Sequence, residues 1–178
     1  MIHSCDRIFS SKFVTSFVVK LWYGTVDSDF SMLESFCDRV LSWCDNSPST
    51  IYLAFKYLQR LKQLCPHLGG SKGSEIRAFS TALLLAHKYI EDRPFNSRIW
   101  SAVTGLNSRE ICIMEREFLT CIQYQTHVTE EEFYHWKRLV DVGNQHYQWT
   151  KWQTASRGFL PFIEILKTAH APAPLPDH

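Results

Sequence analysis

The stretch "SEIRAFSTALLLAHKYIED", residues 74–92, decides the fold because it contains the longest apolar helical pattern of the chain. Apolar side chains recur every three or four residues, and others widen the stripe until little of the helix surface is polar; the set is Ile76, Phe79, Ala82, Leu83, Leu84, Leu85, Ala86 and Ile90. We expect such a helix at the centre of a helical domain. Lys88 is charged although its neighbours are apolar, so the question is whether it serves the structure or a binding partner.

Apolar positions also repeat at helical spacing in the rest of the chain, and no convincing run has the strict alternation of a β-strand. Helix starts are indicated by Ser47 before Pro48, and by the capping-box patterns N-x-x-E and T-x-x-E that begin at Asn107 and Thr129. The predicted fold class is therefore all-α, with further helices over residues 11–22, 29–45, 48–64, 97–105, 107–122 and 129–140.

Length and composition predict one globular domain. The chain has 178 residues, of which 45% are hydrophobic, and this is enough material for one well-buried core. Lysine and arginine number 19 against 18 aspartate and glutamate, and the formal net charge of +1 provides no field suited to nucleic acid or to an anionic membrane. We expect neither a nucleic-acid nor a membrane partner.

Cysteine spacing and the N-terminal region favour an intracellular protein. The six cysteines include no C-x-x-C pair, so reduced thiols are favoured over a zinc site or a disulfide framework. The apolar stretch "FVTSFVVKLWYG", residues 13–24, is interrupted by Lys20 and is shorter than the ~20 residues of a membrane span. No basic segment with a small-residue cleavage site precedes it, so a secretory signal is not expected.

One pattern typical of a metal site is Glu132-x-x-His135, because this spacing puts both ligands on one helix face. A di-iron bundle needs a second such pair, which the sequence lacks, so a solvated helix face is favoured. No phosphate-binding loop, dinucleotide fingerprint, nucleophile elbow or zincin motif occurs. We expect no metal, no cofactor and no enzymatic activity, and we favour a helical binding module. The alternative, an enzyme with a helical-bundle site, predicts bound metal or cofactor.

Three segments together resemble the cyclin box over residues 28–140. They are the central helix, the stretch "NSREICIMEREFLTCIQYQTHVTEEEFYHW" at 107–136, and "SPSTIYLAFKYLQRLKQL" at 47–64. The similarity is greatest to the PHO-type fungal cyclins, which partner a cyclin-dependent kinase in nutrient and cell-cycle signalling. The "MRAIL" element of many animal cyclins is absent, so the substrate-docking groove that it forms is not expected here. Gln59 stands where those cyclins carry an aspartate, and PHO-type members also lack that salt-bridge arrangement, which favours the PHO type.

The resemblance implies a kinase-binding surface and no chemistry of the chain's own. Cyclins carry a lysine and a glutamate side by side against the kinase's regulatory helix, and these match Lys88 and Glu115. The matching apolar positions of the kinase-facing surface are Leu85, Tyr89, Leu119 and Tyr124. The implied partner is a cyclin-dependent serine/threonine kinase, in a heterodimer to which the kinase brings ATP and magnesium.

Without the resemblance, a purely structural role is favoured for Lys88 and Glu115. Lys88 would lay its methylene stem on the core and hold its ammonium in solvent, while Glu115 would pair with Arg109 or Arg116. A second alternative concerns function: a helical interaction scaffold of cyclin fold that does not activate a kinase.

The resemblance also implies a domain organisation. We expect an N-terminal segment with an amphipathic helix at 1–27, a single five-helix cyclin box at 28–142, and a C-terminal tail at 143–178 that is partly docked and flexible at its end. Residues 141–178 are too few for a second box. The N-terminal helix should pack on the box, although a loosely attached segment is an alternative. Nuclear or cytoplasmic localisation is implied by the family alone.

Overall fold

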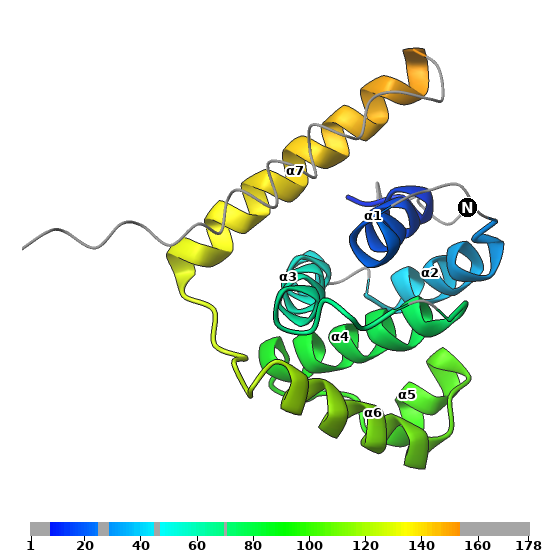
Figure 1. Ribbon diagram of the computed structural model, residues 1–178, viewed down its shortest axis with the longest axis vertical. Coiled ribbons are helices and arrows are strands. Elements are labelled where there is room, and N and C mark those ends of the chain that lie inside the picture. The colour runs from blue at the N-terminus through cyan, green and yellow to red at the C-terminus, as the bar shows by residue number, and fades with distance from the viewer. Residues whose placement is uncertain (1–7, 25–28, 45–46, 70, 154–178) are drawn as a thin grey trace, which may run out of the picture.

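A computed structural model describes residues 8–24, 29–44, 47–69 and 71–153 (Figure 1). The described residues form helices without a strand, so the predicted all-α class is confirmed. The helices are α1 (Ser11–Tyr23), α2 (Ser31–Cys44), α3 (Pro48–Leu64), α4 (Ser74–Ile90), α5 (Ser97–Thr104), α6 (Ser108–Cys121) and α7 (Glu130–Gln153). Helices α2 to α6 lie within the boundaries predicted for the cyclin box, 28–142.

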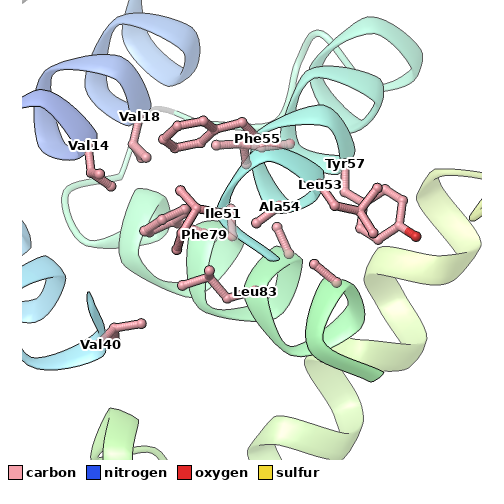
Figure 2. Close-up of a cluster of buried hydrophobic side chains, with 14 of the residues drawn as sticks. Val14, Val18, Val40, Ile51, Leu53, Ala54, Phe55, Tyr57, Phe79 and Leu83 are labelled. Carbon is pink, nitrogen blue, oxygen red and sulfur yellow. The ribbon is translucent and has the colours of Figure 1, made fainter. Parts of the chain in front are cut away.

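Helix α4 is the predicted central helix. Its side chains from Ala78 to His87 are all buried, and it packs against α3, α6 and α1. Figure 2 shows Phe79 and Leu83 of α4 facing Ile51 and Phe55 of α3 across the core. The burial follows from the sequence, since a helix that is apolar on nearly all sides must be covered on nearly all sides.

Helix α1 is firmly packed on the five-helix body. Phe13 and Phe17 are fully buried, and the ring of Phe17 stacks on that of Phe55 with centroids 4.1 Å apart. The indole Nε1 of Trp22 donates to Ser74 Oγ at 2.9 Å and ties the end of α1 to the start of α4. The alternative of a loosely attached N-terminal helix is therefore wrong.

Ser47 precedes α3 as predicted, but its side chain does not cap the helix. Its backbone has φ −141° and ψ 79°, and no first-turn amide donates to its hydroxyl. The Ser47 carbonyl accepts from Thr50 N at 3.0 Å, and its hydroxyl accepts from Thr50 Oγ1 at 3.1 Å. Pro48 takes the first helical position, where its missing N–H costs nothing.

Each of the two predicted capping boxes forms only one of its two hydrogen bonds, the one in which the cap side chain accepts from the helix backbone. The side chains of Asn107 and Thr129 accept backbone N–H groups of α6 and α7 at 2.8 and 3.1 Å. Glu110 and Glu132 do not reach back to their caps, because each pairs with an arginine of a neighbouring helix. A guanidinium is a stronger partner for a carboxylate than a neutral amide is.

Helix α7 is longer than the sequence predicted. The pattern indicated a helix ending near Val140, with a tail beginning at Gly143, whereas α7 is continuous to Gln153. A glycine inside a helix costs only about 1 kcal/mol, and Gly143 is buried while Asn144 Nδ2 donates to the Ile8 carbonyl at 2.9 Å. Tertiary contacts thus override the local signal. The flexible end predicted for the tail falls outside the described residues.

Helix α7 lies on the opposite side of α3 and α4 from α5 and α6 (Figure 1). Trp136 anchors its first half, since its indole Nε1 donates to the Tyr52 carbonyl of α3 at 2.8 Å and its side chain is buried. Along the parts of the chain that the structure covers, no helix is both long and apolar enough to cross a membrane.

Candidate partner-binding surface

Lys88 and Glu115 lie side by side, as the resemblance implied. Lys88 near the end of α4 donates to both carboxylate oxygens of Glu115 on α6, at 2.7 and 2.9 Å. Glu115 therefore pairs with Lys88, and not with Arg109 or Arg116. The Lys88 side chain is 40% exposed and that of Glu115 is 20% exposed. An ion pair at the surface contributes only about 0–1 kcal/mol to folding, so fold stability alone explains this pair poorly.

Two further residues that the resemblance assigned to the partner surface are exposed aromatic side chains. Tyr89 is 48% exposed and Tyr124 is 64% exposed, both high values for large aromatic residues. Leu119 is partly buried and packs against the core. Aromatic residues such as these two tyrosines are enriched in protein interfaces. The residues Lys88, Glu115, Tyr89, Leu119 and Tyr124 are called the pair surface below.

Leu85 is placed differently from the expectation. It was assigned to the kinase-facing surface, but its side chain is only 6% exposed. Its helix is covered on nearly every side, and the position one turn before Tyr89 already lies beneath other helices. Leu85 therefore offers little area to a partner.

Tyr124 is held outward by an unusual turn after α6. Gln123 and Tyr124 have φ angles of +54° and +57°, the left-handed region that non-glycine residues rarely adopt. Tyr124 N donates to the Leu119 carbonyl at 2.8 Å and closes the turn. Each such residue costs about 1 kcal/mol or more, and such conformations concentrate at functional sites.

Helix α3 holds the chain that follows this turn. The Arg60 guanidinium donates through Nη1 to the carbonyls of Gln125 and His127 at 2.7 and 2.9 Å. Between them, the Tyr57 hydroxyl donates to the Thr126 carbonyl at 2.8 Å. Three consecutive carbonyls are therefore bound by two side chains of one helix. Sequence analysis did not identify this role for either residue.

Glu132 of α7 completes the arrangement around Arg60. It accepts from Arg60 Nη2 at 2.9 and 3.0 Å and lies 3.0 Å from the ammonium of Lys56. Burial lowers the pKa of Lys56. Burial alone would raise the pKa of Glu132, but the hydrogen bonds and charges of Lys56 and Arg60 outweigh it and hold that pKa below its ordinary value. The prediction of a merely solvated helix face is therefore wrong for Glu132.

The described residues give no support to a metal site at Glu132 and His135. Glu132 is engaged by two cations, and among the residues with a described position no cluster of three metal-ligating side chains occurs. A usable signal for the real arrangement was present in the sequence: Lys56 and Arg60 stand one turn apart, each next to a residue of the helix's apolar stripe, Phe55 and Leu61.

Tyr89 connects the end of α4 to the chain that follows α6, because its hydroxyl lies 3.3 Å from Nδ1 of His127.

A separate groove of about 330 Å³ lies between α4 and α6, with Trp22, Leu61 and Phe118 among its lining residues. None of the six residues predicted to face a kinase lines that groove.

Comparison with known proteins identifies the family of this chain. The Cyclin family profile matches residues 3–126. Cyclin-P2-1 of Oryza sativa is 30% identical over 62% of this chain and 52% of its own length. Cyclin-U4-1 of Arabidopsis thaliana is 26% identical, over 57% and 50%. PHO85 cyclin-5 of Saccharomyces cerevisiae is 25% identical, over 73% and 59%. The chain spans about half the length of the curated relatives it matches. With a five-helix box and a profile match over most of its length, this chain belongs to the cyclin family, near the PHO-type cyclins.

Proposed function

We propose that this chain is the regulatory subunit of a cyclin-dependent kinase and binds it through the pair surface. The observations that carry the proposal are the Lys88–Glu115 pair at 2.7 Å and the exposure of Tyr89 and Tyr124, two further positions that the resemblance assigned to the kinase-facing surface. Side chains of this kind in an interface can each contribute about 2 kcal/mol or more of binding free energy when they are fully desolvated.

The proposed mechanism is a population shift in the kinase. The chain does no chemistry; it binds the kinase conformation in which the regulatory helix is turned inward and the kinase's own lysine–glutamate pair is formed. A shift from about 1:99 to 99:1 requires that the active conformation be bound about 10⁴-fold more tightly than the inactive one. The kinase supplies ATP and magnesium.

We further propose a kinase of the PHO85 kind as the partner, because one similar yeast cyclin bears that kinase in its name. A role in nutrient or cell-cycle signalling and a nuclear or cytoplasmic localisation are parts of this proposal. The plant cyclins among the similar proteins mean that a fungal source is not required. The unit that binds the kinase is the box at 28–142, with the helix before it as a packed extension.

A binding assay on the purified full chain tests the proposal. A panel of purified cyclin-dependent kinases, including a PHO85-type kinase, is titrated with wild type, Lys88→Ala, Glu115→Ala and Arg77→Ala. Arg77 is a matched control, since it pairs with Glu110 between the same two helices and its side chain is similarly exposed, at 47%.

Wild type and Arg77→Ala are expected to bind one kinase and activate it, and the two variants of the pair to lose at least tenfold in affinity. Equal binding by all four proteins would overturn the site. Binding of an inactive kinase by wild type would move the function to the non-activating scaffold.

A further inference from the structure

We propose that a clamp on α3 sets the shape of segment 122–129 and thereby the affinity for the kinase, without touching the kinase. The α3 clamp consists of Tyr57 and Arg60, with Glu132 of α7 as the anchor of Arg60. The proposal rests on the proposed function, because the segment it controls carries Tyr124 of the pair surface.

The clamp side chains are too deeply buried to be interface residues themselves. Tyr57 is fully buried, and Arg60 is 9% exposed. A partner on the pair surface would meet Tyr124 and Tyr89, while the clamp would lie beneath segment 122–129. Any effect of the clamp on binding must therefore pass through the segment.

The segment needs external support because its own conformation is unfavourable. Two successive non-glycine residues, Gln123 and Tyr124, adopt left-handed φ angles. Such residues persist only where the surroundings determine their conformation strongly. The clamp fixes the conformation of the chain directly after Tyr124, because it donates hydrogen bonds to the carbonyls of Gln125, Thr126 and His127.

Arginine is well suited to the clamp because of its planar fork. Nη1 of Arg60 serves the two carbonyls while Nη2 serves both oxygens of Glu132. A lysine ammonium at this position could not reproduce both sets of bonds in a fixed geometry. The clamp thus connects the first turn of α7 to the segment that carries Tyr124.

A held segment favours binding because less conformational freedom is lost when the kinase docks. Loss of one hydrogen bond from the clamp should weaken kinase binding by about two- to tenfold, the range that one hydrogen bond typically represents. The loss should appear while Lys88, Glu115 and the aromatic rings remain in place.

Three variants of the full chain test the clamp. Tyr57→Phe removes only the bond to the Thr126 carbonyl and keeps the ring in the core. Arg60→Lys keeps the charge but removes the fork, and Glu132→Gln keeps the shape but removes the anchoring charge. The matched control is Arg77→Lys, the same exchange in an exposed arginine–glutamate pair.

Two quantities are measured for each protein: the Kd for the kinase that wild type binds, and amide hydrogen exchange of peptides from segment 122–129 and from α4. We expect the three clamp variants to raise Kd at least twofold and to speed exchange in the segment more than in α4. Arg77→Lys should change neither quantity.

Unchanged Kd in all three variants would overturn the proposal, as would exchange in Tyr57→Phe that rises equally in α4 and in the segment, since in this mildest variant that result indicates general destabilisation. A wild-type chain that binds no kinase of the panel would overturn the proposed function instead, and with it the link from clamp to kinase. The two failures are therefore distinguishable before any variant is made.

Discussion

Replacing Glu132 by glutamine should destabilise the protein far more than a similar change at the surface. The Glu132 carboxylate lies 3.0 Å from Lys56 Nζ and 2.9 Å from Arg60 Nη2, and the two cationic side chains are only 3% and 10% exposed. Removing one partner of a buried ion pair costs about 3–5 kcal/mol. Glu132 itself is 30% exposed, so water can replace part of the loss, and we expect about 2–3 kcal/mol.

Urea and thermal unfolding followed by circular dichroism measure this change. For a chain of this size about 2–3 kcal/mol corresponds to a fall in Tm of about 4–12 °C. Glu131→Gln is the matched control, because Glu131 is exposed in the same first turn of α7. Glu131→Gln loses only a favourable interaction with the helix dipole, so it should lower the free energy of unfolding by less than about 1 kcal/mol.

The double variant Lys56→Met, Glu132→Gln sharpens the test. Removing Lys56 as well eliminates a buried cation that has lost its anion, so the double variant should regain part of the stability lost in Glu132→Gln. The reasoning is refuted if Glu132→Gln costs no more than Glu131→Gln, or if the double variant is less stable than Glu132→Gln.

The same carboxylate makes stability depend on pH. The pKa of Glu132 is held below its ordinary value by Lys56 and Arg60, so the unfolded chain binds its proton more readily than the folded chain. Its contribution is present above pH 4.5 and is lost as pH falls through the lowered folded pKa. Glu132→Gln should therefore show a smaller loss of stability in acid than wild type, measured by urea unfolding at a series of pH values.

Three further predictions concern the core, a buried histidine and the strained turn. Phe17→Ala should cost about 3–5 kcal/mol in urea unfolding, because Phe17 is fully buried and stacks on Phe55; a cost under about 1 kcal/mol would contradict the packing of α1. Burial lowers the pKa of His87, whose Nε2 accepts from Phe95 N at 3.1 Å. The free energy of unfolding should therefore fall as pH drops below 6.5 through the lowered pKa, and His87→Gln should flatten this slope. Tyr124→Gly relieves a φ of +57°, so Tm should stay close to wild type while kinase affinity falls; unchanged affinity would remove Tyr124 from the pair surface.

Local sequence signals were sufficient for most of the helical framework. The apolar pattern from Ser74 to Ile90 defines α4, and Asn96 and Gly105 mark the ends of α5 through side-chain capping and a left-handed φ of 76°. The nearness of Lys88 and Glu115 came from the resemblance, because 27 residues separate them and no local pattern joins them.

Contacts between distant residues account for what the sequence could not predict. Arg60 meets carbonyls 65 and 67 residues later, and such pairings depend on the packing of α7 rather than on local spacing. Gly143 was taken as a helix end because its buried contacts are invisible locally. Leu85 was assigned to the surface because a family pattern fixes position along a helix and not depth.

Kinase activity in the presence of the purified chain tests the central claim most directly. A cyclin-dependent kinase of the panel is titrated with wild type, Lys88→Ala and Arg77→Ala, and phosphate transfer to a generic acceptor peptide is measured. The account predicts activation by wild type and Arg77→Ala at the same concentrations, and a shift of the Lys88→Ala curve to at least tenfold higher concentration. Activation by Lys88→Ala at wild-type concentrations, or no activation of any kinase by wild type, would contradict it.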